Sequence, residues 1–276
     1  MKKKQLFRWV MKGILAGLML ALATSGTVRP DIAKASQNET IDSFGTQFSA
    51  DDILQLLGDS TNKWNSVHVS YTINFKEFGN VEEISQTYQH EFWLMHDGRA
   101  RLEISTFEGS PLVVWVRDDT SISEANYEKG TYTESSLPKS LVGLTEELNS
   151  NAFSAHLIPS GLNDYVFPQS LAESMKRTKI NENAVQEILV IGNETIAGRQ
   201  TVMVERKILD PEQPAIVYKL HRYWIDAETG IILKGEIEDL INGGWTQQFE
   251  AKKVEVNVDI PEETFVFVVD KNFETD

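Results

Sequence analysis

The chain has 276 residues, of which 41% are hydrophobic and 24% are charged, and this composition suits one large or two small globular domains. It contains no cysteine, which excludes a disulfide scaffold, a thiolate metal site, a cysteine nucleophile and a lipidated cysteine anchor. With 41 acidic and 26 basic side chains, its net charge of -15 argues against nucleic-acid binding.

The first 35 residues are typical of a secretory signal peptide. Five basic side chains between Lys2 and Lys12 precede an apolar run of 11 residues, Gly13 to Ala23, and the triplet Ala33-Lys34-Ala35 forms a small-x-small cleavage site. Cleavage after Ala23 is one alternative, and an uncleaved signal that tethers the chain to a membrane is another. Since about 20 apolar residues are needed to cross a bilayer, cleavage is favoured. We expect an extracytoplasmic protein, secreted or associated with the cell envelope, and the basic signal resembles those of Gram-positive bacteria.

The charge of the exported part is more extreme than that of the whole chain. Residues 1–35 hold seven basic side chains and one acidic one, so that residues 36–276 keep 19 basic and 40 acidic ones, a net charge of -21. Phosphate backbones and anionic lipid surfaces would repel such a chain. We expect residues 36–276 to form one domain, with a flexible polar segment at 36–47.

The domain begins with a predicted helix and then changes to strand periodicity. Ser49 can cap a helix whose first turn carries Asp51 and Asp52, and an apolar stripe continues to a point near Trp64. From Val67 to Phe75, apolar residues at odd positions alternate with polar residues at even ones. This alternation predicts a strand with one buried face.

Further strands and two helices are predicted along the rest of the chain. The helices are Leu137 to Leu148 and Pro168 to Thr178, the second with proline in its first turn. The strands alternate in period two and are separated by turn-forming residues: Ile84 to Leu94, Ala100 to Ile104, Leu112 to Val116, Thr120 to Ala125, Thr131 to Thr133, Val185 to Ile191, Gln200 to Lys207, Ile216 to Ile225, Ile231 to Asp239 and Trp245 to Val256.

These elements predict a mainly β (α+β) fold. No segment of helical length separates the later strands, so crossover connections are excluded and the sheet should be antiparallel. About ten or eleven strands are too many for a flat open sheet. We therefore expect a strongly curved antiparallel sheet with helices at its open side.

Hairpin features in the chain resemble a known family. The stretches Ile191 to Arg199, with Ala-Gly-Arg in a turn, and Tyr218 to Lys234, with Trp-Ile-Asp before a Thr-Gly hairpin, are similar to lipoprotein carriers and sorting proteins (LolA/LolB-like) and to the related RseB-type sigma-factor regulators. Gly98 to Glu103 is similar to an early strand of that family. The resemblance implies an incomplete β-barrel with helices covering its mouth and an apolar cavity for acyl chains. No ligand-gating residue of the family matches this chain.

Catalytic patterns are weak. The five histidines, His68, His90, His96, His156 and His221, show no metal-binding spacing, and three of them, His68, His90 and His221, are interpreted as solvated residues on the polar sides of strands. The chain has no nucleophile elbow, dinucleotide fingerprint or Walker motif. We therefore expect no enzyme activity, no cofactor and no metal.

Aromatic residues on the first strands either fill a solid core or line a hollow, and the sequence leaves both possibilities open. Trp93 and Trp115 are assigned to the opposite sides of their strands, beneath helices or in an exposed patch. The residues predicted to line an apolar cavity are Tyr71, Ile73, Phe75, Tyr88, Phe92, Leu94, Leu102 and Ile104.

Two functions are compatible with these observations. The first is an exported binding protein that takes an acyl chain of a lipid or an acylated protein into the cavity by burial alone. The alternative is a cell-envelope regulator that binds the outer domain of a membrane-spanning protein through an exposed patch or a sheet edge.

Overall fold

The structure is a computed structural model, and it describes residues 48–78, 83–137, 168–177, 179–181, 184–240, 244–268 and 273–275. By its contacts the chain divides into two units, 1–40 and 41–276, and all described residues belong to the second. The predicted signal peptide, the predicted flexible segment 36–47 and, apart from Leu137, the predicted helix at 137–148 lie outside the described residues.

The described chain is mainly β, as predicted. Its helical elements are α2 (Ala50–Gly58), α5 (Gln169–Met175) and the short 3-10 turns η2 (Ser60–Lys63) and η3 (Glu262–Phe265). Its strands are β1 (Ser66–Phe78), β2 (Glu83–Met95), β3 (Ala100–Thr106), β4 (Pro111–Arg117), β5 (Ser121–Asn126), β6 (Thr131–Ser136), β7 (Lys179–Asn181), β8 (Ala184–Ile196), β9 (Arg199–Leu209), β10 (Val217–Asp226), β11 (Ile232–Asp239), β12 (Trp245–Val256) and β13 (Glu274–Thr275). The short strands β7 and β13 were not predicted.

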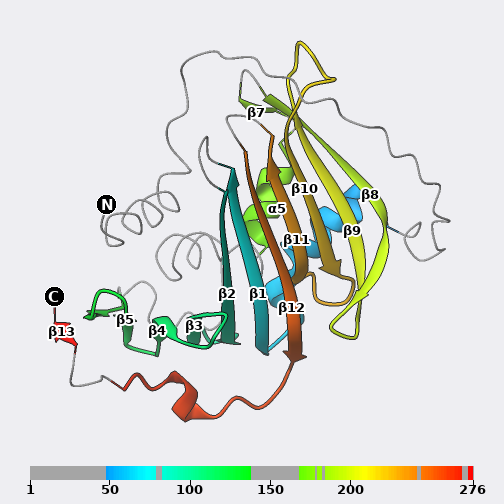
Figure 1. Cartoon of the computed structure of the whole chain (residues 1–276). Coiled ribbons are helices and arrows are strands. Elements are labelled where there is room, and N and C mark those ends of the chain that lie inside the picture. The colour runs from blue at the N-terminus through cyan, green and yellow to red at the C-terminus, as the bar shows by residue number, and fades with distance from the viewer. Residues whose placement is uncertain are drawn as a thin grey trace. The chain divides into compact units, whose positions relative to one another are not determined.

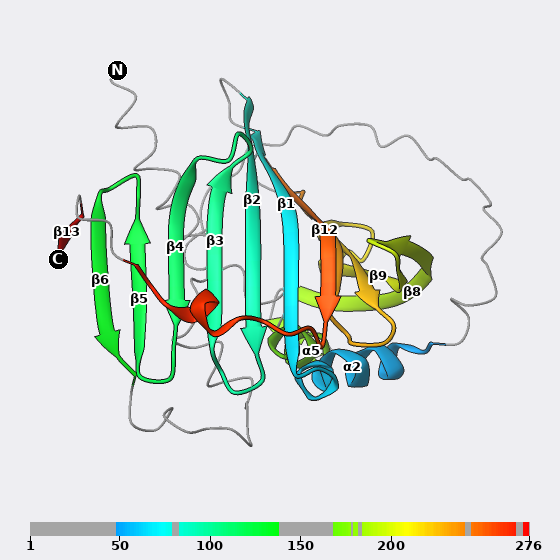
Figure 2. The same ribbon diagram turned by 90° about the horizontal axis from the view of Figure 1, so that it is seen from below.

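All of these strands belong to one open sheet. Their order is β13-β6-β5-β4-β3-β2-β1-β12-β11-β10-β9-β8-β7, so two meanders are joined where β1 pairs with β12. Figure 2 shows β6 to β1 side by side as one layer, from which β12 to β8 turn away. The prediction of an antiparallel sheet is confirmed for every neighbouring pair except β13 and β6, which are parallel because the end of the chain returns along the sheet to its edge.

Strand β1 shows why the sheet has two different sides. Val67, Val69, Tyr71 and Ile73 are buried, and the polar residues between them point to the other side, as the alternation predicted. We call the side of the sheet that carries Tyr71 inward and the opposite side outward.

Helices α2 and α5 cover the inward side of the strands β8 to β12, and they lie behind these strands in Figure 1. A capping box begins α2, since Ser49 and Asp52 exchange hydrogen bonds through side chain and backbone. The helix ends at Gly58 and is followed by η2, so it is shorter than predicted. Its Leu56 carbonyl lies so close to Gly230 that a β-carbon there would be 2.4 Å from the oxygen.

The hairpins that carry the family resemblance are joined by an ion pair. Arg199, at the start of β9, donates from Nε to Asp226 at the end of β10 and from Nη2 to Glu228, 2.9 Å away. Asp226 is buried, and the Thr229 hydroxyl also donates to it at 2.9 Å. The motif therefore ties two neighbouring turns together and has a structural role.

The segment 257–268, which we call the C-terminal strap, crosses the outward side of the first meander (Figure 2). Arg101 in β3 donates to the carbonyl of Thr264 at 3.2 Å, and the Arg99 guanidinium lies 5.3 Å from the centre of the buried Phe265 ring. Phe267 stacks on Tyr132 in β6 with ring centres 5.2 Å apart. The strap covers apolar outward side chains of the first meander.

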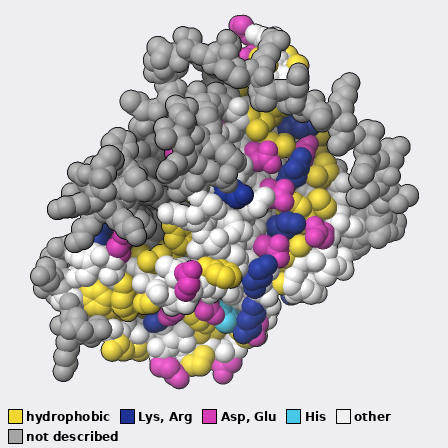
Figure 3. Space-filling model, viewed as in Figure 1, with side chains coloured by type: hydrophobic (Ala, Val, Ile, Leu, Met, Phe, Trp, Pro, Cys, Tyr) yellow, Lys and Arg dark blue, Asp and Glu magenta, His cyan; other side chains and the backbone are white. Residues whose placement is uncertain are grey.

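The outward side of the second meander is charged instead. Arg222 in β10 pairs with Glu205 at 3.0 Å and with Glu236 at 3.7 Å, and the Lys234 ammonium lies 4.1 Å from the centre of the Trp224 ring. Figure 3 shows this face as a stripe of alternating basic and acidic side chains. Charged side chains are well solvated, so this side of the sheet can face water without a covering segment such as the C-terminal strap.

Candidate ligand-binding face

The strand register brings all eight predicted cavity residues to the inward side of β1, β2 and β3. Val69 is opposite Phe92 and Phe92 is opposite Leu102, which makes one continuous row across the three strands. Tyr71, Ile73, Phe92, Leu94 and Leu102 are buried in the main hydrophobic core, and Phe75, Tyr88 and Ile104 are partly buried. Their common face is an observation, and their role in binding a ligand stays a prediction.

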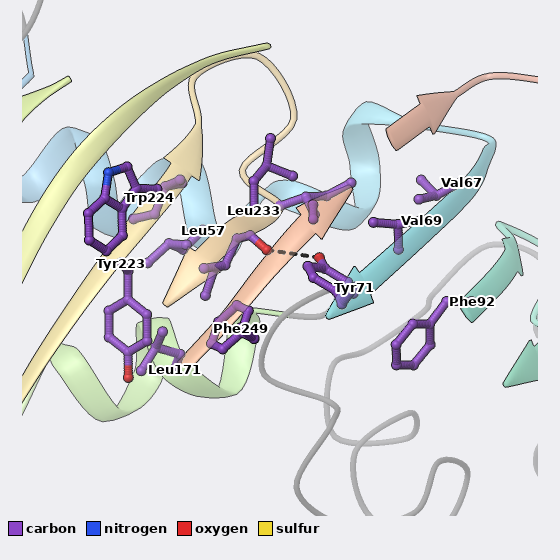
Figure 4. Close-up of a cluster of buried hydrophobic side chains, with 14 of the residues drawn as sticks. Leu57, Val67, Val69, Tyr71, Phe92, Leu171, Tyr223, Trp224, Leu233 and Phe249 are labelled. Carbon is purple, nitrogen blue, oxygen red and sulfur yellow. Dashed lines mark hydrogen bonds between the residues drawn. The ribbon is translucent and has the colours of Figure 1, made fainter. Parts of the chain in front are cut away.

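Tyr71 stands at the border between this face and the helix-packed strands. Its hydroxyl donates to the carbonyl of Ile232 at 2.8 Å, and its ring makes edge contacts with Phe92 at 6.1 Å and Phe249 at 5.9 Å. In Figure 4, Leu171 of α5 lies near Tyr223 and Phe249, whereas Phe92 lies on the far side of Tyr71. The helices thus pack beside the predicted residues rather than across all of them.

The face extends further than the sequence indicated. Trp115 in β4 lies opposite Leu102 and is buried in the same core, so its assignment to the opposite side was wrong. The register between β3 and β4 shifts at Ile104 and Ser105, and therefore even positions point inward in β3 and odd positions in β4. Trp93 does point outward, where it stacks on His68 at 4.9 Å. We call the inward side chains of β1 to β4 the apolar face.

His90 lies within this face, which corrects its interpretation as a solvated residue. It is opposite Tyr71 in β1 and opposite Ile104 in β3, and only 6% of it is exposed. Because β2 carries Tyr88, His90 and Phe92 at alternate positions, the period alone could have revealed that they share one side. Burial lowers the pKa of His90 to about 3, so the imidazole is neutral at pH 7.

His221 and His68 also differ from the prediction. His221 is on the inward side of β10 with Nδ1 2.9 Å from the Tyr223 hydroxyl, and burial, together with the charges of Arg206 and Lys219, lowers its pKa to about 3. His68 points outward as predicted, but its two ring nitrogens each lie 2.8 Å from a carboxylate oxygen. Three strand histidines are thus part of packed or paired structure.

No catalytic centre emerges from the described residues. Within the ranges given above, no three His, Cys, Asp or Glu side chains are grouped so that they could hold a metal ion. Two surface hollows are lined mainly by polar residues: one of about 380 Å³ lies beside Arg199 and Asp226, and one of about 230 Å³ lies on the outward side at Asn74 and Lys234. Both are away from the apolar face. In the same part of the chain, no helix combines the length and the apolar character needed to span a bilayer.

Comparisons with known proteins find similarity in structure alone. No family model matches the sequence. No curated protein matches it either.

The solved structures that match do so distantly. MucB aligns with a TM-score of 0.42 at 15% identity over 79% of this chain, which spans 62% of the MucB chain, and the MucA/MucB complex of Pseudomonas aeruginosa gives similar values. A LolA superfamily protein from Nitrosomonas europaea aligns with a TM-score of 0.39 at 10% identity over 80% of this chain and 98% of that one. LprF from Mycobacterium bovis gives 0.37 at 15% identity, over 77% and 97%. These distant matches include a LolA superfamily protein, the kind of protein to which the sequence was compared above.

Proposed function

We propose that this protein is an exported, non-enzymatic binding protein that holds the acyl chain of a lipid or an acylated protein against the apolar face. One observation carries the proposal: the inward side chains of four adjacent strands form a continuous row of large apolar groups beside the helices. In this proposal the sheet partly surrounds the acyl chain as a half-barrel, and α5 lies at one side of the opening of that half-barrel. A ligand held by burial requires no catalytic group.

The energetics limit the affinity that this face can give. Each CH₂ group removed from water contributes about 0.8 kcal/mol, so a long acyl chain has ample binding energy. The face is buried, however, and a ligand must part side chains that already pack against one another. We therefore expect dissociation constants near 1 μM, or about -8 kcal/mol, rather than much tighter binding.

A fluorescent acyl probe tests this proposal. The delipidated protein should bind it near micromolar concentration, and replacing Ile104 by Trp should weaken binding more than tenfold, because the indole takes up space between β2 and β4. Leu189→Trp is the matched control, since Leu189 is 40% exposed on the outward side of β8 and the same bulk there should change nothing. Circular dichroism and thermal unfolding check that both variants are folded.

Two outcomes would contradict acyl binding. One is a delipidated protein that binds no probe at any accessible concentration. The other is equal weakening by the two tryptophan substitutions, which would show that the probe adheres to the surface.

Export is part of the same proposal and rests on the pattern of residues 1–35. The mature chain should begin at or near Ser36, and intact-mass measurement of the protein from its native host would show this directly. A soluble cytoplasmic form that keeps Met1 would contradict export.

A second candidate function, binding to the outer domain of a membrane-spanning protein, is favoured by the edge of β8. Among the described residues, β7 pairs only with Ala184 and Val185, and the other eleven residues of β8 have no strand beside them on that edge. An open edge of this length can accept an added strand. A photo-crosslinker at Leu189 in living cells should then capture a membrane protein, and a lack of any crosslinked partner would count against it.

A further inference from the structure

His90 is a polar residue at the centre of the proposed acyl-binding face, and any role for it in ligand binding rests on that proposed function. Its neighbours across the sheet are Tyr71 and Ile104, and its neighbours on the same side of β2 are Tyr88 and Phe92. The ring of Phe92 is centred 6.4 Å from that of His90. Among the described residues, the neighbours of the imidazole on the sheet are therefore aromatic and aliphatic side chains.

One ring nitrogen of His90 has no hydrogen-bond partner among the described residues. Its Nδ1 is buried and has no partner there. The nearby Tyr71 hydroxyl donates to Ile232 in β11, which lies on the side of β1 away from β2. His221, a partly buried imidazole on the inward side, differs in that its Nδ1 lies 2.9 Å from the Tyr223 hydroxyl, although its Nε2 also has no partner among the described residues.

An unpaired polar atom inside an apolar region costs free energy, and native proteins rarely leave one without a reason. A ligand that brings an oxygen atom to His90 would remove this cost. None of the four neighbours of His90 named above carries a positive charge, so a buried carboxylate would lack a counterion. A neutral oxygen suits the site better.

We infer that the ligand is an acyl ester or acyl amide whose carbonyl oxygen accepts a hydrogen bond from the His90 imidazole while its hydrocarbon chain packs along the apolar face. His90 then selects the chemical class of the ligand and fixes the position of its hydrocarbon chain along the apolar face. Affinity comes from the hydrocarbon, and the preference for a carbonyl comes from His90.

A matched pair of ligands separates these two contributions. Methyl palmitate and methyl hexadecyl ether have the same chain, but only the ester has a carbonyl. In displacement of the fluorescent acyl probe, the wild-type protein should prefer the ester about fivefold to tenfold, the ratio expected for one net hydrogen bond. In His90→Phe the preference should vanish while the ether binds as before. His221→Phe, the control with the same change on the same side of the sheet, should keep the preference.

An infrared measurement on the unaltered protein gives an independent test. The carbonyl stretch of ¹³C-labelled methyl palmitate should shift to lower frequency on binding, as it does when a carbonyl accepts a hydrogen bond. This test remains valid if His90→Phe does not fold.

The outcomes distinguish the inference from the function on which it rests. If neither ligand displaces the probe, the proposed acyl binding itself is wrong. If both bind equally to the wild-type protein, if the ester preference survives in His90→Phe, or if the bound carbonyl shows no shift, acyl binding stands and the role of His90 is overturned.

Discussion

The two halves of the inward surface are packed by different means. The apolar face of β1 to β4 is held by contact between large side chains, with His90 as its one buried imidazole among the described residues. The strands β8 to β12 are packed against α2 and α5 through fitted contacts and hydrogen bonds. Arg206 in β9, only 6% exposed, donates to Ser174 of α5 at 2.9 Å and to Gln186 at 2.8 Å. We call this second region the helix-packed half.

The difference has a functional meaning. Apolar contact is non-directional, so a face built from it can exchange one apolar partner for another at modest cost. Directional bonds and close backbone approach hold one arrangement and penalise others. Under the proposed function, the apolar face would admit a ligand while the helix-packed half keeps its arrangement.

The largest effect is expected from a charge placed where the two regions meet. Replacing Ile73 by Asp should destabilise the protein by about 4 kcal/mol or more, because a carboxylate without a partner is strongly disfavoured at a buried site. Chemical denaturation of the variant would measure the loss. Asn74→Asp, a similar change on the outward side of the same strand, should cost less than about 1 kcal/mol. Similar losses in the two variants would show that the inward side is not a core.

The close approach of α2 to the sheet gives the next prediction. Gly230→Ala should destabilise by about 3 kcal/mol, because the added carbon would meet the Leu56 carbonyl and the residue has a φ of +77°. Gly109→Ala is the control, since Gly109 has a φ of +87° but open space around it, and it should show only the conformational cost of about 1 kcal/mol. Thermal unfolding of both variants separates contact from backbone strain.

Each half of the inward surface contains one histidine that is neutral in the folded state. Lowering the pH should therefore reduce the stability of the folded protein through both residues. An unfolded histidine titrates near pH 6.5, whereas His90 and His221 have pKa values of about 3 in the folded state. Between these values the unfolded chain binds more protons than the folded one. Stability should therefore be full above pH 6.5 and fall as the pH drops towards 3.

Urea denaturation between pH 7.5 and 5 would measure this loss before most carboxylates titrate. The slope of the unfolding free energy against pH should approach about 1.4 kcal/mol per pH unit for each histidine where it is steepest. His90→Phe and His221→Phe should each flatten it, and an unchanged slope in both would show that other groups cause the loss.

The smallest effect concerns the cap of α2. Ser49→Ala removes the hydroxyl that accepts from the Asp52 backbone and should cost about 1 kcal/mol. Because this cap lies at the outer end of the helix-packed half, acyl-probe affinity should not change. A change in affinity would show that α2 takes part in ligand entry.

Much of the fold was readable from local patterns. Alternation along β1 gave its buried side, Ser49 gave the start of α2, and turn residues gave most strand boundaries. These features depend on neighbours within a few positions, and the sequence displays such neighbours directly.

The candidate face was only partly readable, because each strand was interpreted separately. His90 was assigned to the wrong side although its parity matches that of Phe92, and Trp115 was misplaced because the register shift between β3 and β4 changes the inward parity. Such a shift depends on how the hydrogen bonds between the two strands form, which composition does not reveal.

The sequence by itself determined the class of the fold, since its alternating apolar residues can be buried only in sheets and its turns are too short for crossovers. Tertiary structure decided how the two meanders meet. Pairing of β1 with β12 joins residues as far apart in the chain as Val67 and Val256, and the C-terminal strap covers strands that precede it by more than 100 positions. Contacts between such distant segments arise from the fit of whole surfaces, for which no short stretch of sequence carries a signal.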